Sequence, residues 1–275
     1  MSKSKFNLNL NWRIEMPSLS RITIGAALFA AVNTVALAAA DDRTTWSVGA
    51  EYSSGDYGSP QKTDTYYVPF AVKHETGPWT FKLTVPYLEV TGPGNVIGAG
   101  ADRVVIGDGT AARRTASGIG DVVGAAFYNV LDDRKAPVGL DLGVKVKFPT
   151  ANSDKGLGTG ETDYAVQADL FKTMGSFTPF GTIGYRWFGD PPGVDFRNVF
   201  YASVGGAYRF SRQTTAGFVY DYRDAVVSGG ARVSEVTGYV SQRLSENVKL
   251  QVYALTGFSD ASPNFAAGLN LSYSY

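Results

Sequence analysis

The C-terminal stretch Asn264–Tyr275, NFAAGLNLSYSY, decides the fold. Its apolar residues occupy every second position and end in Tyr273 and Tyr275, while small and polar residues fill the positions between them. A period of two residues is typical of a β-strand with lipid or a protein core on one face and water on the other. Similar stretches recur along the chain, and the connections between them are alternately long and short. This arrangement predicts a transmembrane β-barrel.

The full pattern predicts an all-β chain folded as a transmembrane, antiparallel, up-and-down β-barrel of about 12 strands. If both termini lie in the periplasm, the short connections are periplasmic and the long ones are extracellular. This topology places Asp133 and Glu246 in the periplasm and Gly107 and Gly229 outside. The expected strands are 44–53, 64–76, 78–90, 118–131, 137–149, 161–173, 176–188, 197–210, 213–224, 232–244, 247–258 and 264–275.

Composition narrows the class of protein further. The 275 residues carry 25 basic and 25 acidic side chains, so nothing in the net charge favours a nucleic-acid partner. The absence of cysteine excludes disulfides and thiolate zinc sites. The mean hydropathy of −0.08 is far too low for a helical membrane protein. It suits a barrel, in which only every second strand residue faces lipid.

The N-terminal region is expected to direct export. Arg21 precedes an apolar run, residues 22–40, that ends in small residues at the spacing of a signal-peptidase site. We therefore expect a signal peptide over residues 1–40, cleaved after Ala38 or Ala40, and a barrel over residues 41–275. Either Met1 or Met16 could be the start. A permanent membrane helix is the alternative, but the run is only marginally long enough for a membrane span and is rich in alanine. The first strand follows almost directly, so no plug domain is expected.

A soluble β-sandwich would show the same period of two residues. Three features favour the membrane instead: the signal peptide, strands long enough to cross a bilayer at a tilt, and aromatic residues near strand ends, as in interfacial girdles. Trp46, Trp79 and Trp187 are examples of such residues.

Charged residues that alternate with the apolar ones should face the barrel interior. Two interpretations stay open: the charges pair across strands and stabilise a filled interior, or some of them set the selectivity of a narrow pore. Because both signs occur in similar number, a conducting pore should be only weakly ion-selective, with Lys145 and Lys147 as its densest like-charged pair. The predicted pore-lining residues are Lys82, Asp121, Asp141, Lys145, Lys147, Asp169, Arg186, Arg209, Asp221, Arg223, Glu235, Arg243 and Lys249.

Enzymatic chemistry has little support in the sequence. The one histidine, His74, alternates in step with the outward-facing apolar residues of its strand and lies near the predicted periplasmic end, which favours a position at the membrane interface. Asp154, Glu161 and Asp163 match no metal-binding loop, and solvation of a loop explains them. We expect no catalytic residue, metal site or cofactor. The glycine-rich segment 91–117, which contains Arg103, lacks the context of a phosphate site and is expected to lie outside or fold into the mouth.

Three motifs resemble a known family: Ser117–Val122 (SGIGDV), Lys147–Thr150 (KFPT) and Leu157–Tyr164 (LGTGETDY). They resemble the outer-membrane family named for the MetA pathway of phenol degradation, whose members are often labelled as transporters. The resemblance implies an outer-membrane barrel that admits small aromatic or other hydrophobic compounds, and it carries over no substrate residue. Tyr275 also resembles the aromatic end signal that the barrel-assembly machinery reads.

The sequence therefore predicts a monomeric barrel in the cell outer membrane, surrounded by outer-membrane lipid and lipopolysaccharide. We expect it to pass small solutes, including aromatic or hydrophobic compounds, by passive diffusion, although the sequence does not identify the solute. The alternative is a non-conducting structural or adhesive barrel whose outer loops bind ligands. An enzyme is the least favoured of the three readings.

Overall fold

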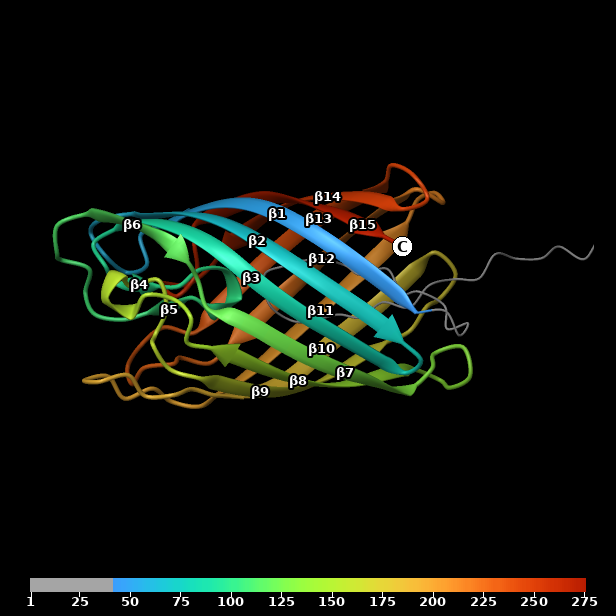
Figure 1. The fold of residues 1–275 in the computed structure, drawn as a ribbon, viewed down its shortest axis with the longest axis horizontal. Helices are drawn as coiled ribbons and strands as arrows, with labels where there is room; N and C mark the ends of the chain where they lie inside the picture. Colours follow the sequence, from blue (N-terminus) through green and yellow to red (C-terminus); the bar gives the residue numbers. More distant parts are fainter. Residues whose placement is uncertain (1–41) are drawn as a thin grey trace, which may run out of the picture.

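The computed structural model describes residues 42–275. The expected signal peptide, its cleavage site and the choice between Met1 and Met16 lie outside the described residues. The described chain forms one antiparallel sheet that closes on itself, because β1 (Arg43–Gly55) pairs with both β2 (Thr63–Thr76) and the last strand, β15 (Phe265–Ser274). Figure 1 shows the tilted strands of this barrel. The predicted barrel is confirmed.

The barrel has twelve strands, one of which is interrupted. The expected strand 118–131 consists of two pieces, β6 (Arg114–Ile119) and β7 (Val122–Leu131), and both pair with β3 (Trp79–Gly92). The break faces Pro86, which has no N–H and accepts a hydrogen bond from Gly120 N at 2.9 Å. The remaining strands are β8 (Gly139–Phe148), β9 (Asp163–Phe171), β10 (Phe177–Trp187), β11 (Val199–Arg209), β12 (Thr214–Arg223), β13 (Val233–Arg243) and β14 (Val248–Gly257).

Long and short connections lie at opposite ends of the barrel (Figure 1). The shortest is Gly77–Pro78 between β2 and β3, where Gly77 adopts a left-handed φ of 53° that a glycine accepts without strain. The extracellular position of the long loops stays a prediction. Residues 42–275 contain no helix that is long and apolar enough to span a membrane.

The two faces of the wall are inverted relative to a soluble protein. The outer face exposes large apolar side chains, such as Leu142 (49% exposed) and Val252 (46% exposed). The inner face buries polar ones, and Asp169, Glu235 and Gln251 are among the most completely buried side chains. Exposed apolar residues around a polar interior are stable only when lipid surrounds the barrel, which argues against the soluble alternative.

Aromatic side chains fill the interior toward the short-turn end. A cluster forms from Phe171, Phe180, Ala207, Tyr239 and Tyr253. Small residues make room for these rings, and a Cβ at Gly205 would lie 2.6 Å from the ring of Phe180. The interior is therefore packed at this end rather than widely open.

We predict that Leu142→Arg destabilises the folded barrel by about 2–4 kcal/mol, because the charge would enter the hydrocarbon layer. Folding titrations into lipid bilayers measure this free energy. Ala112→Arg, in an exposed outer loop, is the matched control and should change the stability little. Equal tolerance at the two positions would argue against a lipid-facing wall. Gly143 faces inward, but arginine there cannot serve as the control. Even the Cβ of a larger residue at this position would lie 2.5 Å from the ring of Phe127.

The topology gives a second prediction. The chain has no cysteine, so single cysteines can report which side of the membrane a residue faces. A membrane-impermeant maleimide added to intact cells should label Ser228→Cys in a long loop and spare Glu246→Cys in a short turn. Both positions are exposed, so access decides the result. The reverse labelling pattern would invert the orientation.

Candidate functional site

The longest connection, loop 93–113 between β3 and β6, folds into the barrel mouth (Figure 1). It carries two short strands, β4 (Val96–Ile97) and β5 (Val104–Val105), and one turn of 3-10 helix, Gly100–Asp102. The loop turns inward because it has apolar side chains to bury. Val104 is 1% exposed and packs in a cluster with Phe188, Phe196, Val199 and Val226. The sequence left open whether this segment lies outside the barrel or folds into its mouth, and the structure shows that it folds into the mouth.

Two arginines, Arg103 buried and Arg223 half-buried, anchor this loop to strands β12 and β13. Arg103 of the loop forms a salt bridge with Glu235 of β13 and donates to the carbonyl oxygen of Ala261 at 3.3 Å. Arg223 of β12 donates to the carbonyl oxygens of Ala101 and Arg103, both at 2.7 Å. Burial alone would lower the pKa of Arg103, but the charge of Glu235 raises the pKa above its ordinary value. The guanidinium therefore keeps its charge, and the loop stays anchored.

A third anchor joins the turn of this loop to the wall beside it. Arg186 of β10 binds Asp102 at 2.8 Å through one terminal nitrogen and Asp163 of β9 at 2.6 Å through the other. Asp163 is only 2% exposed, so solvation of a loop does not explain it as the sequence suggested. Asp154 is exposed and fits that explanation.

The three motifs meet at Lys147. Its ammonium binds Asp121 at 2.8 Å, Thr159 at 2.8 Å and Asp163 at 3.3 Å, and the side chain is 4% exposed. Thr150 bridges the break between β6 and β7, because its hydroxyl accepts from Val122 N at 2.9 Å and donates to the carbonyl oxygen of Gly120 at 3.0 Å. The motifs therefore hold loop 149–162 against the interrupted strand, and Lys147 belongs to this anchor.

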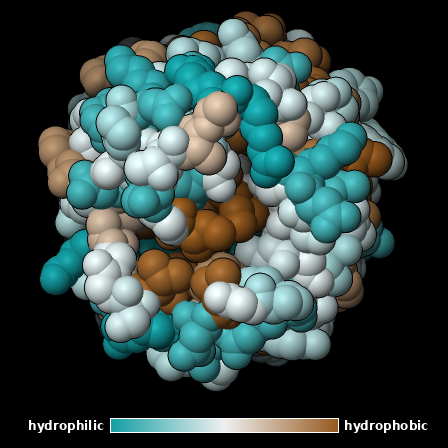
Figure 2. Space-filling view, turned by 90° about the vertical axis from the view of Figure 1, so that its left-hand side faces the viewer, coloured by the Kyte–Doolittle hydropathy of each residue, from teal (hydrophilic) through white to brown (hydrophobic). Residues whose placement is uncertain are grey.

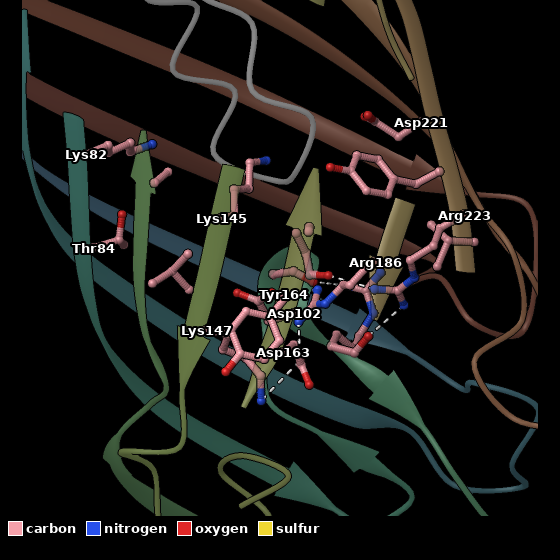
Figure 3. Close-up of a pocket in the computed structure, with 18 of the residues that line it drawn as sticks. Lys82, Thr84, Asp102, Lys145, Lys147, Asp163, Tyr164, Arg186, Asp221 and Arg223 are labelled. Atoms are coloured by element: carbon pink, nitrogen blue, oxygen red, sulfur yellow. Dashed lines mark hydrogen bonds and ion pairs between the residues drawn. The ribbon is translucent and has the colours of Figure 1, made fainter. Parts of the chain in front are cut away.

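The anchored loop 93–113 forms one side of a cavity of about 180 Å³ (Figure 3). Loop residues 100–103 contribute to its lining, together with inward side chains of the barrel strands. Apolar lining comes from Val123, Ala125 and Phe127 of β7. The sequence-predicted residues that the structure brings together here are Lys82, Lys145, Lys147, Arg186, Asp221, Arg223 and Glu235.

The other six predicted residues lie elsewhere and do not line this cavity. Asp121 binds Lys147, Asp141 accepts from Asn129, and Asp169 accepts from Gln167 and Thr182. Arg209 donates to the carbonyl oxygen of Gly175 in a short turn at 3.0 Å. Arg243 and Lys249 line a separate small crevice at the short-turn end.

Sequence reasoning missed Asp102 and Arg103 as interior residues. Their segment is a long connection, and alternation cannot give the parity of a loop. The available signal was composition, because Val96, Ile97, Val104 and Val105 are apolar although they belong to a long connection. A loop with that many apolar residues must bury them against something.

The mouth itself is hollow and apolar. Figure 2 views the barrel from its loop end and shows hydrophobic residues at the floor of a central hollow, inside a more polar rim. Ile106, Val194 and Val227 are partly buried and pack against the cluster around Val104. An apolar solute that reached this face would find an apolar surface.

Solved structures support the fold. The COG4313 outer membrane channel from Pseudomonas putida F1 matches with a TM-score of 0.68 and 16% identity, over 86% of this chain and 97% of that chain. The NanC porin matches with a TM-score of 0.56 and 12% identity, over 83% and 98%. The β domain of the Bordetella autotransporter BrkA matches with a TM-score of 0.51 and 13% identity, over 86% and 100%. No curated protein matches the chain.

The family comparison covers almost the whole described chain. The family model named for the MetA pathway of phenol degradation matches residues 43–275. This span contains the three motifs around Lys147 and every strand of the barrel. A closed barrel with an apolar outer face also locates the protein in the outer membrane, surrounded by lipid. The chain therefore belongs to the outer-membrane family named for the MetA pathway of phenol degradation.

Proposed function

We propose that this barrel lets small solutes with an apolar part, including aromatic compounds, cross the outer membrane by passive diffusion. The observation that carries the proposal is the apolar hollow at the mouth, with a cavity of about 180 Å³ on the inner side of loop 93–113. Burial of apolar surface is favourable by roughly 25 cal/mol per Å². An apolar solute therefore gains free energy at the mouth, whereas a strongly hydrated one loses hydration in the narrow interior.

The loop anchors fit a selective passage better than a wide one. Arg103, Arg186 and Arg223 hold loop 93–113 across the interior through charged hydrogen bonds. Such bonds are roughly twice as strong as neutral hydrogen bonds, so the loop stays in place and narrows the barrel interior. The similar solved structures include proteins described as a channel and a porin, which supports passage as the type of function.

We infer no catalytic role. His74 Nδ1 lies 3.0 Å from Thr44 Oγ1 at the short-turn end of the wall, and it does not line the cavity. A hydrolase of the serine–histidine type needs its histidine beside a nucleophile and a substrate cleft.

The alternative is a non-conducting structural or adhesive barrel with ligand-binding outer loops. The aromatic cluster around Phe180 and Tyr239 favours it, because these rings narrow the interior toward the short-turn end.

We also propose that the barrel works as a monomer, since the pairing of β1 with β15 leaves the sheet without open edges. Its environment would include lipopolysaccharide, and the exposed Tyr275 would meet the assembly machinery.

Release of the loop anchor tests the passage. Arg103→Ala removes the salt bridge to Glu235, so loop 93–113 should loosen and the single-channel conductance in planar bilayers should rise several-fold. Arg113→Ala is the matched control in the same loop. It removes an exposed pair with Asp64, 2.7 Å long, which contributes little. The control should therefore conduct like the wild type.

The same preparations should take up small aromatic solutes into liposomes. If neither the wild type nor Arg103→Ala gives conductance or uptake, the passage proposal fails and the structural alternative replaces it.

A further inference from the structure

One wall of the cavity carries only positive charge. The charged residues of β2, β3, β7 and β8 that line it are all lysines: Lys73, Lys82, Lys145 and Lys147. Lys73 lies 3.0 Å from Glu75, and Lys147 belongs to the anchor at Asp121. Lys82 and Lys145 extend from the wall toward the cavity (Figure 3).

Lys82 and Lys145 lie at the same level of the wall. Lys82 of β3 pairs with Ala125 of β7, and Ala125 pairs with Lys145 of β8. Their Cα atoms are therefore two strand spacings apart, or about 10 Å. The small Ala125 side chain leaves space between the two long side chains. Lys82 also feels the positive charges of Lys145 and Lys73, and an anion placed among them would relieve this repulsion.

The surface beside the two lysines is apolar and aromatic. Val123 and Phe127 line the cavity on either side of Ala125, and Phe127 is 5% exposed. Across the cavity, the ring centre of Tyr201 lies 6.0 Å from the Lys145 ammonium. An engineered cavity of about 150 Å³ is enough to hold benzene. The cavity of about 180 Å³ can therefore hold one aromatic ring beside the lysines.

The carboxylates that line the cavity lie in loop 93–113 and on strands β9, β12 and β13. Asp102 and Asp163 both bind Arg186. Asp221 and Glu235 are on β12 and β13, and Glu235 is bound to Arg103. Asp169, which also acts on the charge of Lys145, accepts hydrogen bonds from Thr182 and Gln167. The rest of the lining therefore carries both signs, since Arg103, Arg186 and Arg223 lie among these acids. A solute with an anionic end would be attracted to the strands whose lining charges are all lysines.

Positive charge continues from this wall toward the short-turn end. Lys73 is the direct cross-strand partner of Lys82 and also borders the crevice at that end. An anion leaving Lys82 in this direction would meet further cations and two carboxylates, Glu75 and Glu246. The charged residues of the crevice are Arg43, Lys73, Arg243, Glu246 and Lys249.

We propose that the barrel binds small organic anions with an apolar body, of which aromatic carboxylates are the simplest class, with the carboxylate between Lys82 and Lys145 and the ring against Val123 and Phe127. This inference names a solute class for the proposed passage and rests on it for transport. Binding at the site is a separate property that can be measured by itself.

Binding is tested on the full barrel in detergent, with fluorobenzoate and its neutral isostere fluorobenzamide followed by fluorine NMR. Fluorobenzoate should bind, and fluorobenzamide should bind with a Kd about tenfold higher, because a hydrogen bond to a charged group contributes about 1.4 kcal/mol more than a neutral one. The double variant Lys82→Gln/Lys145→Gln should lose about the same factor for fluorobenzoate alone. Lys155→Gln, in an exposed outer turn, is the matched control and should bind like the wild type.

A merely structural role of the two lysines would change both ligands alike, so the ratio of the two affinities is the decisive readout. Equal affinity for the two ligands in the wild type, or an unchanged ratio in the double variant, overturns the proposal. Circular dichroism of each variant checks that the barrel is folded. Should the double variant fail to fold, the single variant Lys82→Gln, with a smaller loss in the same ratio, replaces it.

Liposome uptake of the same two compounds separates this inference from the proposed passage. Fluorobenzoate that binds while neither compound crosses would leave the anion site standing and refute passage. Uptake of both compounds without preferred binding of fluorobenzoate would support passage and refute the anion site.

Discussion

The pairing of β1 with β15 is the interaction on which the rest of the structure depends. In hydrocarbon no water is available for open backbone groups, so a sheet can cross the bilayer only when its edges bond to each other. The register from Thr45↔Ser274 to Ser54↔Phe265 achieves this closure. It also fixes parity, because a slip by one residue would exchange the lipid-facing and inward residues of the strand. The inward position of every charged strand residue discussed above follows from that parity.

Much of this architecture follows from a local period, and the remainder does not. Alternation with a period of two residues predicts the strands and their inward faces, because one face of each strand contacts lipid and the other contacts the polar interior. It could not predict the break at Gly120, which arises from Pro86 on the neighbouring strand. It also could not place loop 93–113. The salt bridge that holds the loop joins Arg103 to Glu235, residues that are 132 positions apart. Contacts at that separation leave no mark on local periodicity.

The interior charges divide into two groups that look alike in the sequence. Arg103, Lys147 and Arg186 are bound by carboxylates and hold loops 93–113 and 149–162, so their loss would leave buried acids without counter-charges. Lys82 and Lys145 extend from the wall toward the cavity. Lys147 and Lys145 are two residues apart and share one face, yet Lys147 binds Asp121 and Thr159, whereas Lys145 lies near the ring of Tyr201. The period of the strand does not encode this difference.

Asp163 binds both Arg186 and Lys147, and this sharing has a mechanical consequence. Arg186 holds loop 93–113 through Asp102, whereas Lys147 holds loop 149–162 through Thr159. A movement that pulled either cation away would change the electrostatic balance of the other, because one carboxylate serves both. The two loops should therefore loosen cooperatively, as a single hinged unit, and a disturbance that begins at one side of the mouth would spread to the other.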